Sequence, residues 1–380
     1  TAEEMLEQPQ LADVCVIATQ DKQHVEHGVK AIQKGYHLIC EKPISPSIEE
    51  CLRLQNTAHE HHRVVAVGHV LRYTPFYSKI KEVIEAGVIG NVVTVQAMEH
   101  VTYWHQAHSY VRGNWRRSEE TSPMLFAKCC HDLDIFVWLI GKKCKRVSSY
   151  GDLYLFKPEM APEGASVRCL DCPVKDTCPY DAEKIYVTSE LTGIRKVIRE
   201  NRTQNAAWPV CILSPNDLSE EAIYRELREG PYGRCVYHCD NNVVDHQVVN
   251  MEFEDHVTVN FMMTAFTSKG GRTIHVCGTK GDIVGNLSDN KVTVTRHGEA
   301  SEVIDVAHGD MSGHAGGDNR LIHDFLSALS EEEGEENLKT NIDVSVQSHL
   351  IAAAAEYSRI HQGASVDIQN YLDEEKYKDM

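Results

Sequence analysis

The chain has 380 residues, a formal net charge of −18 at pH 7 and a hydrophobic fraction of 42%. The length predicts two domains, and the composition is that of a soluble globular protein. The acidic balance argues against nucleic acid, which needs a basic face, and no run approaches the roughly 20 apolar residues of a membrane span. Thirteen cysteines spread through apolar segments predict reduced thiols and a cytoplasmic location.

The first part of the chain alternates between strands and helices. We expect strands at 13–19, 36–40 and 64–67, with helices at 21–34, 46–62 and 76–86. This alternation predicts βαβ units in a parallel sheet, and hence an incomplete Rossmann-type dinucleotide-binding domain over residues 1–90. The Gly-x-Gly-x-x-Gly turn of such a domain is not found. About 60 residues, or two βα units of roughly 30 residues, are expected to be missing before residue 1.

Residues 91–380 have a different character and are expected to form an α/β domain for substrate binding and oligomerisation. Segments rich in β-forming residues predict an open, mostly antiparallel sheet with helices on one face, at 91–101, 144–156, 248–253, 257–265 and 272–278. Residues from about 157 to 233 are expected to form an insertion, because they are too many for a plain loop. A C-terminal helix at about 341–362 is expected to pack back on the first domain. The fold class is therefore α/β plus α+β.

The tripeptide Glu41-Lys42-Pro43 follows the apolar strand 36–40. It places Lys42 at the carboxyl edge of the predicted parallel sheet, where nucleotides and substrates bind. A lysine there can donate to a sugar oxygen and relay a proton. The alternative is a surface lysine at the start of a loop stopped by proline.

A second candidate site lies on a predicted helix over 122–141, with Ser122 as its N-cap and Gly141 after its end. Lys128 and His131 are three residues apart and therefore share one face. A nearby cation lowers the pKa of a histidine, which leaves an imidazole able to accept a proton. The alternative is a satisfied core histidine, with Asp132 neutralising Lys128.

Residues 103–116 combine aromatic, histidine and arginine side chains of the kind that contact sugars. The candidate substrate residues are Trp104, His108, Arg112 and Trp115, with His246 as a further contribution from the sheet. A folded loop with incidental aromatics is the alternative.

The insertion contains a Cys-x2-Cys-x5-Cys spacing at Cys169, Cys172 and Cys178. Three thiolates at this spacing can share a structural zinc ion, with Cys235, His238 or Cys239 as the fourth ligand. Unligated thiols and an iron–sulfur cluster are the alternatives.

Taken together, these motifs resemble the Gfo/Idh/MocA family, the glucose-fructose oxidoreductase and inositol dehydrogenase superfamily. The matching segments are Ala18-Thr19 with His24, Gly-Tyr-His-Leu-Ile-Cys-Glu-Lys-Pro at 35–43, Gly-His-Val-Leu-Arg-Tyr-Thr-Pro at 68–75, Gly-Val-Ile-Gly at 87–90, His-Asp-Leu-Asp at 131–134 and Gly-Thr-Lys-Gly at 278–281.

The resemblance implies an NAD(P)-dependent oxidoreductase that transfers a hydride between a nicotinamide cofactor and a hydroxyl of a sugar, cyclitol or sugar acid. It implies that Ala18, Thr19, His24, Glu41 and Lys42 line the cofactor, that His131 is the general base and that Tyr73 lies at the substrate. Many relatives carry Asp four residues before this histidine. Here that position is Ala127, and Lys128 is expected to position the substrate.

Two further functions remain open for such a chain. One is an NAD-dependent glycosidase that acts through a transient ketone, and the other is a non-catalytic dinucleotide or sugar sensor. Lys42 and His131 argue against the sensor, whereas the missing Gly-rich turn argues for it. The partners expected are a small carbohydrate-type substrate and further copies of the chain, in a homodimer or homotetramer.

Overall fold

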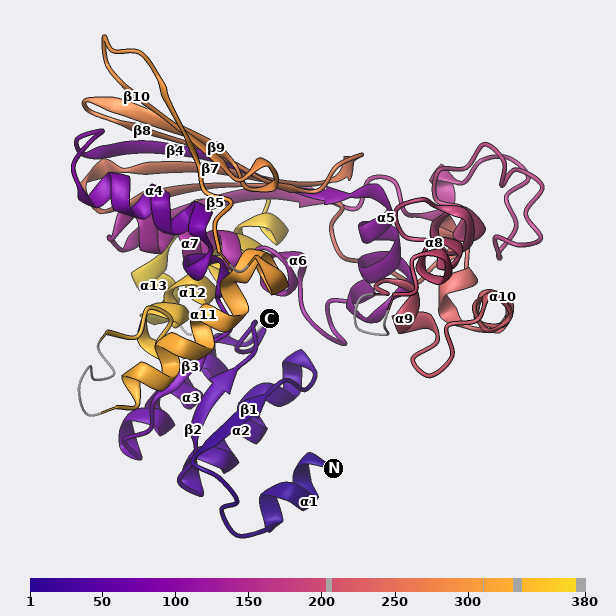
Figure 1. Ribbon diagram of the computed structural model, residues 1–380, viewed down its shortest axis with the longest axis horizontal. Coiled ribbons are helices and arrows are strands. Elements are labelled where there is room, and N and C mark those ends of the chain that lie inside the picture. Colours follow the sequence, from indigo (N-terminus) through magenta and orange to yellow (C-terminus); the bar gives the residue numbers. More distant parts are fainter. Residues whose placement is uncertain (203–206, 310, 331–336, 374–380) are drawn as a thin grey trace.

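The computed structural model describes residues 1–202, 207–309, 311–330 and 337–373. Figure 1 shows three parts: a small domain at the N-terminal end, a large sheet with helices against one face, and an insertion that stands beside the sheet. Among the described helices, none is long and apolar enough to cross a membrane.

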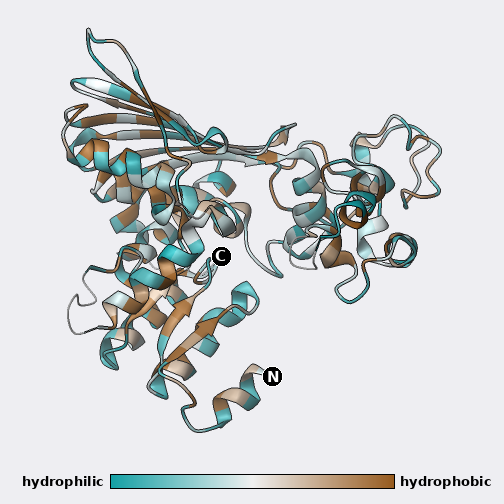
Figure 2. Cartoon of the chain, viewed as in Figure 1, coloured by the Kyte–Doolittle hydropathy of each residue, from teal (hydrophilic) through white to brown (hydrophobic). Residues whose placement is uncertain are grey.

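The small domain is built on three parallel strands in the order β1-β2-β3. The strands are short and strongly apolar (Figure 2), as expected for strands covered by helices. Helix α2 ends before Gly35, whose φ of +100° suits a residue without a side chain. The elements are α1 (Ala2–Glu7), β1 (Val14–Ile17), α2 (His24–Gln33), β2 (His37–Cys40), α3 (Ile48–Glu60) and β3 (Val65–Val67).

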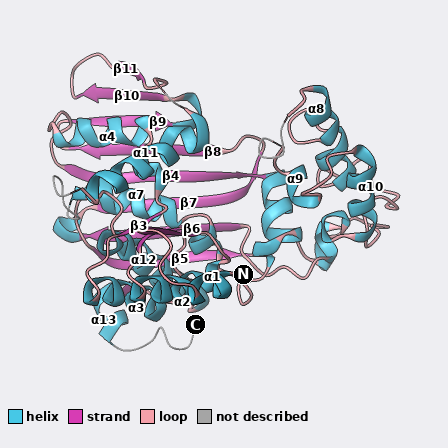
Figure 3. Ribbon diagram, turned by 60° about the horizontal axis from the view of Figure 1, so that its bottom comes forward, coloured by secondary structure: helices cyan, strands magenta, loops and turns pink. Residues whose placement is uncertain are grey.

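The second domain contains a sheet of nine strands in the order β11-β10-β9-β8-β4-β7-β6-β5-β12 (Figure 3). Within the described part of this sheet, only the pairing of β4 with β7 is parallel, and the other pairings are antiparallel. The predicted open, mostly antiparallel sheet is therefore confirmed. The strands are β4 (Val92–Thr102), β5 (Cys144–Asp152), β6 (His246–Phe253), β7 (Thr258–Thr267), β8 (Gly271–Gly278), β9 (Gly281–Asn286), β10 (Lys291–Arg296), β11 (Glu302–Asp305) and β12 (Val366–Asp367).

Helices cover one face of this sheet and join it to the small domain (Figure 1). Helix α12 packs on β5, α7 and α3, and the backbone N–H of Ile44 donates 2.9 Å to Nε2 of His349 in α12. One continuous buried cluster runs from Leu38 in β2 to Phe261 in β7. The helices are α4 (Pro75–Glu85), α6 (Met124–Ala127), α7 (Cys130–Ile140), α11 (Ser312–Ala328), α12 (Ile342–Ile360) and α13 (Ile368–Asp373).

The insertion fills the sequence between β5 and β6, from residue 153 to residue 245. It is longer at both ends than the predicted 157–233, because β5 already ends at Asp152 and β6 begins only at His246. It has its own buried cluster, which also takes in Ala107 and Val111 from the segment after β4. Its helices are α8 (Ile194–Arg199), α9 (Val210–Leu213) and α10 (Glu220–Glu229), and the short helix α5 (Tyr103–His105) leads toward it from β4.

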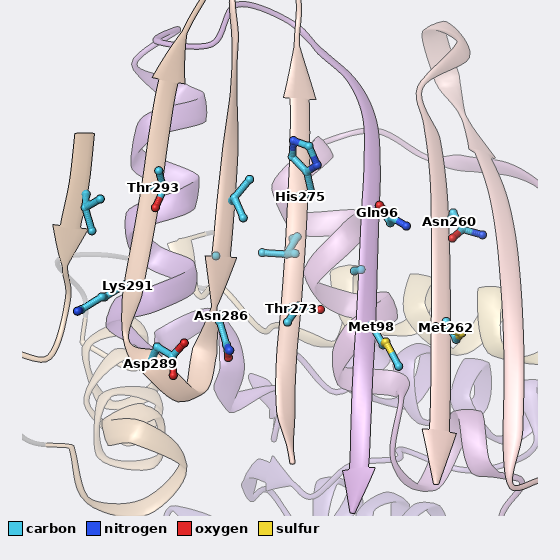
Figure 4. Close-up of a pocket in the computed structure, with 15 residues that line it drawn as sticks. Gln96, Met98, Asn260, Met262, Thr273, His275, Asn286, Asp289, Lys291 and Thr293 are labelled. Atoms are coloured by element: carbon cyan, nitrogen blue, oxygen red, sulfur yellow. The ribbon is translucent and has the colours of Figure 1, made fainter. Parts of the chain in front are cut away.

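No helix of the described residues covers the other face of the large sheet (Figure 3). Figure 4 shows side chains from β4, β7, β8, β9 and β10 standing on this face around a shallow hollow of about 540 Å³. Met262, Val284 and Val303 are 37%, 45% and 61% exposed there. These apolar side chains lie among polar ones such as Gln96 and Asn260.

Candidate active site

The lysine that follows β2 reaches across to the second domain. Glu41 and Lys42 lie just beyond the carboxyl end of β2, the edge at which open α/β sheets bind nucleotides. The Nζ atom of Lys42 donates a 2.8 Å hydrogen bond to the carbonyl oxygen of Ala127. The cation of the small domain is therefore held against the segment that carries His131.

His131 lies in the first turn of α7 and is 7% exposed. Its Nδ1 atom is buried and has no hydrogen-bond partner among the described residues. The rings of His69 and His314 lie 5.8 and 6.5 Å from its ring, centre to centre. Burial lowers the pKa of His131 well below its ordinary value, and the charge of Lys42 lowers it further. The imidazole is therefore neutral near pH 7 and can accept a proton.

A buried arginine–carboxylate pair fixes α7 against the small domain. Arg72 donates from Nε and Nη2 to the two oxygens of Asp134, at 2.7 and 2.6 Å. Both residues are almost completely buried, and Nη1 of Arg72 donates 2.6 Å to the carbonyl oxygen of Lys339. Because Asp134 is three residues after His131, this pair also sets the position of the histidine.

The prediction of a single helix over 122–141 is wrong, because the helix is interrupted at Lys128, between the end of α6 and the start of α7. The carbonyl of Ala127 accepts the hydrogen bond from Lys42 at this break. Ser122 does not cap the helix: α6 begins after Pro123, and the hydroxyl of Ser122 donates to the carboxylate of Asp21.

Lys128 does not pair with Asp132. The alternative of a satisfied core histidine required that pair. The Nζ atom of Lys128 lies 3.5 Å from Oε1 of Glu99. Arg272 pairs with Glu99 at 2.9 Å and with Asp132 at 2.8 Å. Burial raises the pKa of Asp132, and the charge of Arg272 opposes that rise. Two cations and two carboxylates thus balance one another, and three of the four (Glu99, Lys128 and Arg272) line the pocket described below.

The predicted cofactor residues gather at one edge of the small sheet. Ala18, Thr19 and Glu41 are exposed there. His24 is buried and joins the two loops, since Nδ1 lies 2.8 Å from the carbonyl oxygen of Pro43 and Nε2 lies 3.0 Å from that of Thr19. Exposed positions at the ends of parallel strands fit the nicotinamide half of a dinucleotide. His24 supports these loops from within.

A pocket of about 450 Å³ lies beside Lys128. Its charged lining residues include Glu99, Lys128 and Arg272, and its aromatic lining residues include Trp104, His105 and Trp208. The ring of Trp208 lies 5.1 Å from that of Trp104 and 5.0 Å from that of His105, centre to centre. Burial, followed by the charge of Lys128, lowers the pKa of His105 well below its ordinary value. The pocket therefore combines a charged floor with an uncharged aromatic wall.

Of the predicted substrate residues, only Trp104 lines this pocket. His108 and Arg112 are 2% and 1% exposed and lie in the core of the insertion. Nδ1 of His108 contacts the hydroxyl of Tyr186 at 3.0 Å, and Arg112 donates to backbone carbonyls. Their polar groups are used inside the insertion, so the prediction of substrate contact is corrected for both.

The other three predicted substrate residues also lie away from the pocket lining. Tyr73 is buried, and its hydroxyl donates 2.7 Å to Asp324. Trp115 donates from Nε1 to Asp21 and so ties the second domain to the start of α2. His246 pairs with the neighbouring Asp245 at 2.8 Å. These contacts account for the polar groups of the three residues, and their contact with a substrate stays a prediction.

Sequence reasoning missed Glu99, Arg272, His105 and Trp208. One of them carried a usable signal: Glu99 stands at an inward position of β4, where Val95, Ala97 and Val101 are apolar. A carboxylate on the buried face of an alternating strand predicts a buried partner. Trp208 belongs to the insertion and is 40% exposed, and no local sequence pattern points from it to the pocket.

All thirteen cysteines lie in the described part of the chain, and all are free. Among the described residues, no three His, Cys, Asp or Glu side chains are placed to hold a metal ion. A zinc ion on Cys169, Cys172 and Cys178 therefore stays a prediction.

Comparison with known proteins agrees with this architecture. Residues 1–69 match "Oxidoreductase family, NAD-binding Rossmann fold", and residues 81–366 match "Oxidoreductase family, C-terminal alpha/beta domain". The chain is 25% identical over 330 residues to the putative oxidoreductase YteT of Bacillus subtilis, covering 83% of this chain and 72% of that protein. It spans 55% of the length of a second curated relative.

Two solved structures share the fold. An inositol dehydrogenase homolog from Azotobacter vinelandii, complexed with NADH and myo-inositol, has a TM-score of 0.61 at 16% identity, with 96% of this chain and 80% of that chain covered. A levoglucosan dehydrogenase, complexed with NADH and levoglucosan, has a TM-score of 0.64 at 17% identity, covering 96% and 82%.

These matches define the class of protein: an oxidoreductase with a nicotinamide-binding Rossmann domain and a second α/β domain. The chain belongs to the Gfo/Idh/MocA oxidoreductase family, as its motifs indicated.

Proposed function

We propose that this protein oxidises a secondary hydroxyl of a sugar, cyclitol or sugar acid, with NAD or NADP as the hydride acceptor. The observation that carries the proposal is the buried His131, whose Nδ1 has no hydrogen-bond partner among the described residues, close to the segment on which Lys42 is held. This is the pair that alcohol oxidation needs, because one group must take the hydroxyl proton and another must stabilise the developing alkoxide.

Each residue has a separate task in this reaction. His131 accepts the hydroxyl proton, and Lys42 stabilises negative charge on the substrate oxygen. Lys128 donates hydrogen bonds to a neighbouring hydroxyl, since its nearest ion-pair partner, Glu99, is 3.5 Å away and it lies at the pocket. Thr19 and Glu41 would hold the nicotinamide half of the cofactor, which would supply the hydride acceptor for the same carbon.

The wall of the pocket supports a carbohydrate-type substrate. Trp104 and Trp208 offer aromatic faces to the C–H groups of a sugar ring, and the charged floor offers donors to its hydroxyls. Fold relatives were crystallised with myo-inositol and with levoglucosan, a cyclitol and an anhydrosugar. We therefore place compact polyhydroxylated rings first among the candidates.

We also propose that the open sheet face joins copies of the chain in a homodimer or homotetramer. Exposed apolar side chains such as Met262, Val284 and Val303 stand on a broad, helix-free face. Burying this face against a second copy would remove them from water. Light scattering on the purified protein tests this, with Val284→Lys expected to weaken the assembly.

The proposed reaction is tested by following reduced nicotinamide absorbance with NAD+ and NADP+ across a panel of inositols, anhydrosugars, pyranoses and sugar acids. For the best substrate, His131→Asn and Lys42→Met should each lower kcat by about 10²–10⁴-fold. Lys79→Met is the matched control, because Lys79 is a surface lysine paired with Glu82, and it should leave kcat unchanged.

Two outcomes would contradict the proposal. Full turnover by both site variants would remove His131 and Lys42 from the chemistry. Cleavage of a glycoside without accumulation of reduced nicotinamide would show that the oxidation is only a transient step.

A further inference from the structure

The insertion brings four cysteines together from two separate loops. The backbone N–H of Cys169 donates 2.9 Å to the carbonyl oxygen of Gly233, and the backbone N–H of Cys235 donates 2.9 Å to that of Val167. These bonds place the loop of Cys169, Cys172 and Cys178 alongside the loop of Cys235. All four side chains line one small cavity of about 10 Å³. None of the four forms a disulfide.

A buried arginine stands next to this cavity without a carboxylate partner. Arg112 is 1% exposed, and no carboxylate of the described residues pairs with it. Nη2 donates 3.4 Å to the Sγ atom of Cys169 and 2.7 Å to the carbonyl oxygen of Tyr180, and Nε donates 2.7 Å to that of Arg234. Nη1 is buried and has no partner among the described residues.

A buried cation needs nearby negative charge. Arg72, the other fully buried arginine of the described residues, has it in Asp134, and the partly buried Arg272 has it in Glu99 and Asp132. The cavity lining offers Arg112 one carboxylate, Asp181, whose charge acts on Arg112 although no hydrogen bond or ion pair joins the two, and four thiols, which together can supply more negative charge than one carboxylate. Four thiolates around a metal carry a net negative charge, whereas four protonated thiols carry none.

We propose that Cys169, Cys172, Cys178 and Cys235 are the ligands of a four-thiolate metal centre, with Arg112 as its charge-compensating neighbour. The site goes beyond the proposed dehydrogenase reaction and has no part in hydride transfer. A sulfur-only donor set suits zinc or an iron–sulfur cluster. As they stand, no three of the thiols are placed to hold one ion. Metal binding therefore requires their Sγ atoms to turn about χ1 into the cavity that they line.

The centre would hold the wall of the substrate pocket in place. Arg112 ends the helical turn Gln106–Arg112, which directly follows Trp104 and His105 of that wall. Metal ligation by residues from two loops would tie both loops to Arg112 and hence to this turn. Metal loss should therefore loosen the insertion and lower its melting temperature.

The test is metal and sulfide analysis of the whole protein, purified without oxygen and without added metal. The expected result is about one zinc ion or one iron–sulfur cluster per chain, with broad visible absorbance only in the second case. Cys172→Ser and Cys235→Ser should each lose most of the metal. Cys239→Ser and Cys211→Ser are matched controls from the same insertion, because neither side chain lines the cavity, and they should keep it.

A second measurement covers the case in which the serine variants fold poorly. The wild-type protein, stripped with a chelator, should take up Zn2+, or Fe2+ with sulfide, and its melting temperature should rise on reloading. The proposal is overturned if the wild-type protein carries neither metal and takes up neither. It is equally overturned if Cys239→Ser loses as much metal as Cys235→Ser, or if mass spectrometry finds the four cysteines paired as disulfides in the freshly purified protein.

Discussion

The proposed substrate site has two parts that are built in different ways: a floor, taken here to include the buried charges around Lys42 and His131, and an aromatic wall. On the floor, buried charges occur in matched sets: Arg72 with Asp134, and Arg272 with Asp132 and Glu99. The wall comes from α5 and the insertion and is aromatic, and the arginine buried behind it, Arg112, meets thiols and backbone carbonyls. The difference shows that the reacting groups rest on a rigid ionic frame, whereas the substrate-facing wall depends on how the insertion is held.

The largest expected effect tests the rigidity of the floor. Arg72→Met should destabilise the protein by about 3–5 kcal/mol, because it leaves the buried carboxylate of Asp134 without its cation. Denaturant unfolding measures this loss. Arg53→Met removes an exposed pair with Glu50 on α3 and should cost less than about 1 kcal/mol. Equal losses for the two variants would show that the floor is not held by its buried ion pair.

The second test concerns charge at the reaction centre. Burial, Lys42, His69, Arg272 and His314 all disfavour protonation of His131, so the acid limb of kcat/KM should lie below the ordinary histidine pKa of 6.5. Activity needs the neutral imidazole and is therefore lost as the pH falls. Lys42→Met removes one positive charge, which makes protonation easier and should move the limb to higher pH.

Lys79→Met is again the control, and its pH profile should coincide with that of the wild-type protein. If the limb of Lys42→Met stays where it was, the charge of Lys42 does not act on the titrating group. If it moves to lower pH, the group that titrates is not His131.

The sequence predicted the candidate catalytic residues of the floor, Lys42 and His131, far better than the residues of the wall. Lys42 and His131 sit in motifs whose position at a sheet edge and on a buried helix can be inferred from local pattern. The break at Lys128 was missed because a tertiary contact, from Lys42 Nζ to the Ala127 carbonyl, occupies a backbone oxygen within an otherwise helical stretch. The two-domain fold was predictable because strand–helix alternation and β-rich segments are properties of the chain itself.

The wall escaped prediction because its residues meet only in the folded protein. Trp104 and Trp208 are about a hundred positions apart, and their ring centres lie 5.1 Å from each other. His108 and Arg112 looked like substrate residues because they are polar and close to Trp104. The helical turn that carries them faces the core of the insertion instead. A sequence pattern reports residue type, whereas the direction of each side chain here is set by packing.

The smallest expected effect tests what the wall contributes. Trp208→Ala should raise KM by about threefold to tenfold, which corresponds to roughly 0.5–1.5 kcal/mol of lost ring contact. It should leave kcat nearly unchanged, because Trp208 belongs to the aromatic wall and not to the reacting groups. Steady-state kinetics with the best substrate of the panel measures both constants. Ile198→Ala, an exposed apolar position of α8 outside the pocket lining, is the control for loosening of the insertion. A fall in kcat with KM unchanged would mean that the insertion acts on the reacting groups, and the separation between floor and wall would then not hold.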